Sequence, residues 1–141
     1  MDPAAFQAYA ITSSLLAAEL IILAFMTGGA RSKSKKYVNP EDAKTFKGDV
    51  ADRDSPETIR AQRMHMNLLE NAVPFFVVGA LYVVTGASKT GAYGYFGTFL
   101  VARLLHPIFY MKAIQPFRTL MFAIGALAIL GMAFHVIRSV I

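Results

Sequence analysis

The stretch RAQRMHMNLLENAVPF, residues 60–75, decides the fold, because a polar helical face runs there into an apolar segment long enough to cross a membrane. Arg63, Asn67 and Glu70 recur at intervals of three and four positions, which places them within about 60° of arc on one face of a helix. A carboxylate or an amide in hydrocarbon carries a high energetic cost unless a partner satisfies it. This face therefore binds a polar ligand or bridges to neighbouring helices, and its residues alone leave both roles open.

The rest of the chain has the composition of a membrane protein. It has 141 residues, of which 55% are hydrophobic and 16% are charged. Since about 20 apolar residues cross a bilayer as a helix, four segments qualify as spans: residues 4–30, 60–86, 91–112 and 117–138. We therefore predict an all-α membrane protein, a four-transmembrane-helix bundle that forms a single domain over residues 1–141. The first segment is too long for the core of a signal peptide, so we expect it to be retained.

Basic residues are concentrated in one part of the chain. Nine of the fourteen Lys and Arg residues lie between Arg31 and Arg63. The positive-inside rule places the loop 31–55 in the cytoplasm and both termini on the opposite side of an integral, multi-pass protein. A basic segment beside a membrane span meets lipid head groups, so we expect membrane lipids rather than nucleic acid as its partner.

Local signals mark the loop and the start of the second span. Asn39-Pro40 predicts a turn, and Ser55-Pro56 reads as a helix N-cap followed by proline at the first helical position. The chain has no cysteine, so it has no disulfide and no thiol nucleophile of its own. Its three histidines are dispersed, and we expect no metal site.

The third span carries a second polar row, Arg103, His106 and Tyr110, which also shares about 60° of arc. Arg103 lies deep in the span and needs a counter-charge, for which Glu70 and Glu19 are the candidates. A structural ion pair is the favoured role of Arg103 over direct ligand contact. For His106 and Tyr110, packing and a functional role remain equally open.

The fourth span begins with Pro116, Phe117, Arg118 and Thr119. A helix N-terminus presents free N–H groups and a positive dipole end, so an arginine there can stabilise an anion such as a thiolate. The commoner role of such an arginine is to extend its side chain to the membrane interface, and this feature taken alone favours that role.

Four motifs together resemble the MAPEG family, the membrane-associated proteins in eicosanoid and glutathione metabolism. They are NPED at residues 39–42, Arg63…Asn67…Glu70-Asn-x-x-Pro-Phe at 63–75, Arg-x-x-His-x-x-x-Tyr at 103–110, and Pro-x-Arg-Thr at 116–119. Their order and their places on four spans extend the resemblance from about residue 24 to residue 137.

The resemblance implies a homotrimer that binds glutathione near the cytoplasmic side, between adjacent subunits. The residues that match the family's glutathione-binding positions are Arg31, Arg63, Asn67, Glu70, His106, Tyr110 and Arg118. Those implied to act in catalysis are Arg118, which would face the glutathione sulfur, Thr119 beside it, and Asp42 in the loop. The membrane would be the bacterial inner membrane or the endoplasmic reticulum.

The implied function is a glutathione transferase acting on hydrophobic electrophiles from the bilayer, with reduction of lipid hydroperoxides as a companion activity. The alternative is a glutathione-dependent isomerase of prostaglandin endoperoxides. Met66 and Phe122 stand where the isomerase branch of the family has an arginine and a tyrosine, which favours the transferase. Glu19 replaces a lysine of both branches and Pro107 replaces a threonine, which leaves helix contacts around them open.

Two non-enzymatic functions remain as alternatives. One is a MAPEG member that presents lipid to a partner enzyme without catalysis, although this chain keeps most of the glutathione-binding residues. The other is a small four-span cation exporter that would use Glu19 for proton coupling. The long basic loop argues against an exporter.

Overall fold

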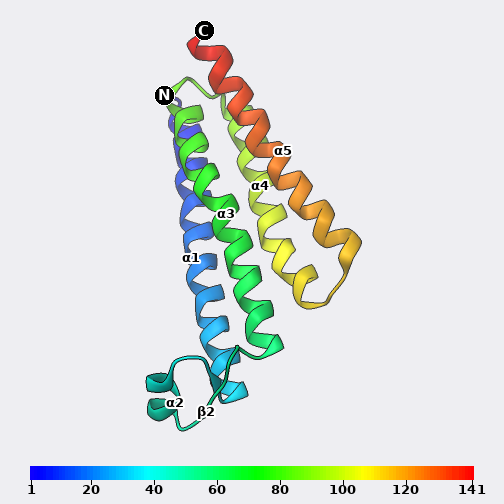
Figure 1. The fold of residues 1–141 in the computed structure, drawn as a ribbon. Helices are drawn as coiled ribbons and strands as arrows, with labels where there is room; N and C mark the ends of the chain where they lie inside the picture. The colour runs from blue at the N-terminus through cyan, green and yellow to red at the C-terminus, as the bar shows by residue number, and fades with distance from the viewer. The chain divides into compact units, whose positions relative to one another are not determined.

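The computed structural model describes residues 1–141 as five helices and one short two-stranded sheet (Figure 1). In chain order the elements are α1 (Pro3–Ser34), β1 (Lys36–Tyr37), α2 (Pro40–Phe46), β2 (Asp49–Val50), α3 (Pro56–Val84), α4 (Lys89–Met111) and α5 (Gln115–Val140). The predicted all-α fold class is confirmed, and each predicted span falls on one long helix.

Three of these helices, α1, α3 and α5, are long and apolar enough to cross a membrane. This agrees with the prediction of an integral membrane protein. Helix α4 has 23 residues, but its first half, KTGAYGYFGT, is rich in glycine, tyrosine and threonine and therefore less apolar. The crossing of the membrane by α4 and the homotrimer stay predictions.

The chain divides into two compact units. The first, which we call the helical unit, combines Met1–Glu19 with Leu68–Ile141. The second, the loop unit, is Leu20–Asn67. The expectation of a single domain over residues 1–141 stays a prediction.

The helical unit has an aromatic core. The rings of Phe75 and Phe99 stack with their centroids 4.4 Å apart, and Phe96 packs edge-on against Phe75 at 5.7 Å. The Tyr9 hydroxyl donates a hydrogen bond of 2.9 Å to the carbonyl of Phe76, which satisfies a polar group within this core. Large rings from α1, α3 and α4 thus fix the segments of these helices that belong to the unit.

Helices α4 and α5 run antiparallel and pack against each other (Figure 1). Their close approach depends on two glycines of α5, because a Cβ added at Gly125 would meet the Arg103 guanidinium and one at Gly131 would meet the Tyr95 ring. These small residues therefore serve packing within the chain.

The N-cap predicted at Ser55-Pro56 is confirmed at the atomic level. Helix α3 begins at Pro56, and the Ser55 hydroxyl oxygen accepts a hydrogen bond of 3.2 Å from the Thr58 backbone N–H. This is the N-cap geometry that leaves fewer helix-terminal N–H groups unsatisfied. Pro74 and Pro107 lie inside α3 and α4.

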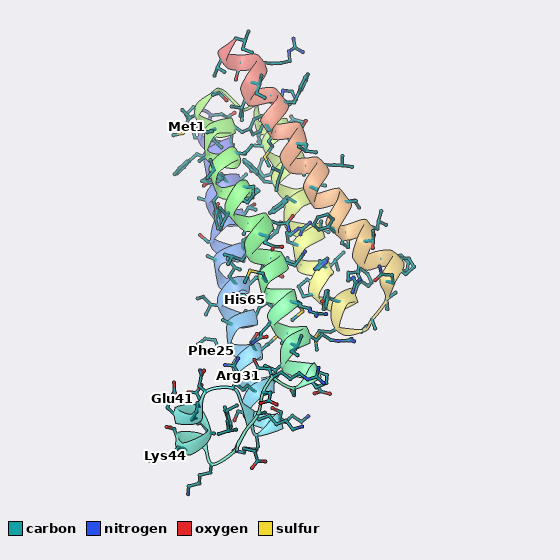
Figure 2. All side chains as sticks on the ribbon, viewed as in Figure 1. Met1, Phe25, Arg31, Glu41, Lys44 and His65 are labelled. Atoms are coloured by element: carbon teal, nitrogen blue, oxygen red, sulfur yellow. The ribbon has the colours of Figure 1, made fainter.

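Regular structure extends into the predicted loop 31–55, and the internal structure of that segment was missed. Helix α1 continues through Arg31 to Ser34 and ends before Lys35, whose backbone is left-handed with φ 55°. Basic side chains in a last helical turn complement the negative end of the helix dipole, which favours this extension. The loop then forms α2, from which Glu41 and Lys44 point outward, and the parallel β1–β2 pair (Figure 2). Strands of two residues give no alternation that a sequence pattern could reveal.

Candidate functional site

Three residues predicted to line a binding site gather where α4 ends and α5 begins. The Arg118 guanidinium lies 4.9 Å from the centroid of the Tyr110 ring, and that ring lies 5.8 Å from the His106 ring. His106 is buried, whereas Tyr110 and Arg118 are half-buried. The contact over the Tyr110 ring is a cation–π interaction that orients the arginine while leaving its N–H groups available to a ligand.

The local sequence explains why Arg118 occupies the first turn of α5. Ala113 takes a left-handed conformation with φ 57°, which ends α4, and Pro116 lies among the first residues of α5. The Arg118 backbone N–H donates a 3.1 Å hydrogen bond to the Ile114 carbonyl, so the side chain projects from the positive end of the helix dipole. Thr119 beside it is exposed. An arginine at the start of a helix is suited to an anion.

Arg103 lies elsewhere on α4 and is held by the protein itself. Its Nη2 atom donates to the carbonyls of Met121 at 3.3 Å and Phe122 at 3.0 Å. The rings of Phe99 and Phe122 lie 5.3 and 5.7 Å from its guanidinium carbon. The side chain is 1% exposed, and its Nε and Nη1 atoms have no hydrogen-bond partner.

Glu19 is the carboxylate whose charge attracts Arg103. It is also buried, at 8% exposure, and its Oε2 atom has no hydrogen-bond partner. The expected structural role of Arg103 fits this environment, with Glu19 as its counter-charge. The two backbone carbonyls of α5 were not foreseen, because any residue can present a carbonyl.

The polar face that decides the fold lies on one helix, α3. Arg63 and Glu70 are exposed on it and Asn67 is half-buried. The predicted helical spacing is therefore correct, and the role of the face stays a prediction.

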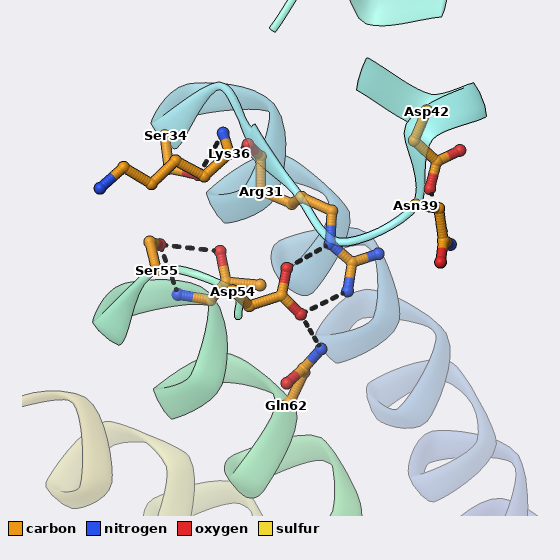
Figure 3. Close-up of polar contacts among 9 residues, drawn as sticks. Arg31, Ser34, Lys36, Asn39, Asp42, Asp54, Ser55 and Gln62 are labelled. Carbon is orange, nitrogen blue, oxygen red and sulfur yellow. Dashed lines mark hydrogen bonds and ion pairs between the residues drawn. The ribbon is translucent and has the colours of Figure 1, made fainter. Parts of the chain in front are cut away.

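A second polar cluster lies in the loop unit and centres on Arg31 (Figure 3). Its Nε and Nη2 atoms donate hydrogen bonds of 2.9 Å to the two carboxylate oxygens of Asp54. Gln62 donates a third bond of 2.8 Å to the same carboxylate. The hydrogen bond from Arg31 is the main reason why the pKa of Asp54 is held below its ordinary value. Neither Asp54 nor Gln62 was predicted to belong to a site.

The loop unit also contains a cavity of about 240 Å³ that brings two predicted site residues together. Arg31 and Asp42 both line it, with Gly28, Ser32, Tyr37 and Phe46. Asp42 accepts a 3.2 Å hydrogen bond from the Asn39 side chain through Oδ2, which orients its carboxylate (Figure 3). Tyr37 was missed by sequence reasoning, because a single tyrosine in a basic loop carries no positional signal.

The helical architecture, with three helices long and apolar enough to cross a membrane, defines an all-α integral membrane protein. Comparison with known proteins gives the family: the model of the MAPEG family matches residues 9–138, and the chain belongs to that family.

The similar proteins include two differently named enzymes. The chain is 33% identical to human microsomal glutathione S-transferase 1, in an alignment that covers 99% of the chain and 93% of that protein. The identity to the rat protein of the same name is 35%, with the same coverage. The chain is 30% identical to human prostaglandin E synthase, over 97% of the chain and 91% of that protein.

Proposed function

We propose that this protein is a glutathione-dependent enzyme of the MAPEG type that conjugates glutathione to hydrophobic electrophiles. The observation that carries the proposal is the cluster of Arg118, Tyr110 and His106 where α4 meets α5. The named activity of the glutathione S-transferase relatives supports the same conclusion. Arg63, Asn67, Glu70 and Arg31 are proposed to hold the peptide of glutathione, as the family resemblance implies.

In this reaction the protein supplies no nucleophile, and its task is to bind and activate the thiol of glutathione. Arg118 is proposed to stabilise the thiolate by charge and hydrogen bonding, supported by the dipole of α5. Lowering the thiol pKa from about 8.5 to about 6–7 would make much of it thiolate at neutral pH. The thiol proton passes to solvent when the thiolate forms. The thiolate sulfur then attacks the electrophilic carbon, and the bond between that carbon and the leaving group breaks.

The second substrate is proposed to arrive through the membrane. Two apolar grooves of about 480 and 430 Å³ lie along α4 and α5 and share Thr98 and Ile124. The groove of about 430 Å³ is lined in part by Leu105 and Met121. Leu105 directly precedes His106 in the sequence of α4, and Met121 follows Arg118 within one turn of α5. An apolar groove open to lipid suits a hydrophobic electrophile or a lipid hydroperoxide.

The experiment that tests the proposal replaces Arg118 and monitors the thiolate. Addition of glutathione to the purified protein should raise the ultraviolet absorbance of the thiolate, and Arg118→Ala should abolish that rise and lower kcat/KM for a chloronitrobenzene by about 10²-fold. Lys112→Ala, at an exposed lysine that ends α4, is the matched control. An undiminished thiolate signal in Arg118→Ala would remove Arg118 from this role.

A second candidate function is isomerisation of prostaglandin endoperoxides, favoured by the similarity to prostaglandin E synthase and by the position of Asp42 in a cavity. Turnover of an endoperoxide and of a chloronitrobenzene by the same preparation separates the two activities.

Failure to bind glutathione in calorimetry would favour a non-catalytic, lipid-presenting member. The homotrimer and a cytoplasmic glutathione site belong to this proposal as well.

A further inference from the structure

Three polar rings from α3, α4 and α5 meet at the end of the helical unit where α3 connects to α4 and α5 ends (Figure 1). The Tyr95 ring lies 5.6 Å from the Tyr82 ring and 5.7 Å from the His135 ring, measured between centroids. The Tyr82 and His135 rings are 5.9 Å apart. None of the three is hydrogen-bonded within the chain. Packed phenols and imidazoles usually have a hydrogen-bond partner, so this cluster is suited to a ligand that supplies one.

The cluster is accessible and lies at one end of an apolar groove. His135 is exposed, and Tyr95 is half-buried and lines the groove of about 480 Å³. The Tyr82 ring is 5% exposed, and its hydroxyl oxygen keeps some accessible surface. A Cβ added at Gly91, which also lines the groove, would meet this oxygen and the Ser88 hydroxyl. The hydroxyls are therefore directed toward the end of the groove.

The groove is long enough for a hydrocarbon chain. It continues into the groove of about 430 Å³ through the shared residues Thr98 and Ile124, and the two extend along α4 from Gly91 to Leu105. These 14 steps correspond to about 21 Å of helix. The acyl chains of one leaflet span about 15 Å, half of the hydrocarbon core. Apart from Tyr95 and Thr98, the lining residues are glycine or apolar.

The charges at this end of the helical unit favour an anion. Residues 71–141 contain no Asp or Glu. Lys89 begins α4 and Arg138 lies in the last turn of α5, and both are exposed. The N-terminus of α4 adds the positive end of a helix dipole. Asp2, the acidic side chain beside the start of α1, already accepts a 2.7 Å hydrogen bond from the Ala4 backbone N–H.

We propose that this cluster binds the carboxylate of a long-chain fatty acid, whose hydrocarbon chain lies in the groove along α4 and α5. The hydroxyls of Tyr82 and Tyr95 and the His135 imidazole provide hydrogen-bond donors. Lys89 and Arg138 provide positive charge. A neutral amphiphile such as an alkylated quinone would use the donors but gain nothing from the charges, so the carboxylate is favoured.

This binding does not depend on glutathione chemistry, because none of the five residues belongs to the proposed glutathione site. The groove itself is the one proposed for the second substrate. A bound fatty acid should therefore compete with a hydrophobic electrophile, and that expectation alone rests on the proposed function.

The test uses the full chain in phosphatidylcholine nanodiscs, without glutathione, and a fatty acid with a photoreactive diazirine at the end of its hydrocarbon chain. Labelling of α4 and α5 is mapped by peptide mass spectrometry. Oleate should suppress this labelling at a concentration about 10-fold lower than methyl oleate, because the ester has no charge. Tyr95→Phe keeps the ring and removes the hydroxyl. It should raise the oleate concentration needed about 3- to 10-fold and change that for the ester less.

A second variant tests the groove at an exposed position, where folding is not at risk. A Cβ at Gly94 meets nothing within 4 Å, so Gly94→Leu should fill the groove and abolish the labelling that oleate suppresses. Ala18→Leu adds bulk at an exposed position of α1 outside both grooves and is its control. Tyr93→Phe, at an exposed tyrosine of α4, is the control for Tyr95→Phe. Both controls should behave as the wild type.

Several outcomes would overturn the fatty-acid site. They are equal suppression by oleate and its ester, stronger suppression by an alkylated quinone, and labelling that neither Tyr95→Phe nor Gly94→Leu changes. Absence of oleate-sensitive labelling would mean that bulk lipid or another copy of the chain covers the groove, and it also overturns the site. Arg118→Ala separates this result from the proposed transferase, because it should lose the thiolate signal and keep the oleate-sensitive labelling.

Discussion

Two arginines, Arg31 in the loop unit and Arg103 in the helical unit, are held by the protein in opposite ways. Arg31 is partly exposed and meets Asp54 in a two-pronged ion pair. Arg103 is fully buried, and the groups that accept from it are backbone carbonyls of α5, with Glu19 acting only through its charge. The planar pair uses two N–H groups of Arg31 and both carboxylate oxygens of Asp54, whereas two nitrogens of the buried Arg103 have no hydrogen-bond partner.

This difference indicates what each arginine does for the fold. A buried charge that lacks full hydrogen bonding is costly, so Arg103 is stabilised only while its surroundings remain intact. Its removal would leave Glu19 buried without a counter-charge. The Arg31 pair borders water, where screening weakens each interaction, so its loss should cost less. The loss of stability caused by mutation should therefore differ between the two sites, both in size and in its dependence on pH.

The largest effect is expected at Arg103. Arg103→Met removes the counter-charge of Glu19 and two hydrogen bonds to α5, which should lower the free energy of unfolding by about 3–5 kcal/mol. Thermal unfolding of the detergent-solubilised protein measures this. Adding Glu19→Gln should recover part of the loss, because it removes the unpaired charge. Arg138→Met, at an exposed arginine of α5, is the control, and an equal loss there would contradict the assigned role.

A smaller effect is expected from the glycine that makes room for Arg103. Gly125→Ala places a methyl group against the guanidinium and should cost about 1–3 kcal/mol by overpacking. Gly94→Ala is a matched control on α4, because a Cβ there meets nothing and the helix gains propensity. The same thermal unfolding measurement compares the two. If Gly125→Ala were as stable as Gly94→Ala, the guanidinium would have to be free to move.

The sequence predicted the parts of this fold that depend on periodicity and length. Four apolar segments became four long helices, and the Ser55 N-cap appeared where the local pattern placed it. It also predicted that Arg103 needs a counter-charge, because burial of a lone cation has a general cost. These features follow from the physics of one segment at a time.

The features that were missed join residues far apart in the chain. Asp54 lies 23 positions from Arg31, in a loop whose several acidic residues are equivalent by composition. The β1–β2 pair and the cavity beside Tyr37 likewise depend on how the loop closes on itself. Within the candidate site, the contact of Arg118 with Tyr110 joins two helices. Helical spacing relates residues of one helix, so it could not predict a contact between these two.

The smallest effect is expected at Asp54, and its pH dependence separates it from Arg103. Asp54→Asn should cost about 1–2 kcal/mol at neutral pH, since it weakens the bonds from Arg31 and Gln62. The pKa of Asp54 is lowered in the folded protein, so its stabilisation is complete above the unfolded value of about 3.9 and is lost as pH falls through the folded value.

Unfolding temperatures of the wild type and Asp54→Asn, measured from neutral pH into this acidic range, should therefore converge. Asp52→Asn changes an exposed neighbour and should follow the wild type throughout. If the difference in unfolding temperature between the wild type and Asp54→Asn stayed constant into acid, the charge of Asp54 would not be what stabilises its contact with Arg31. Arg31 and Arg103 would then differ only in how deeply they are buried.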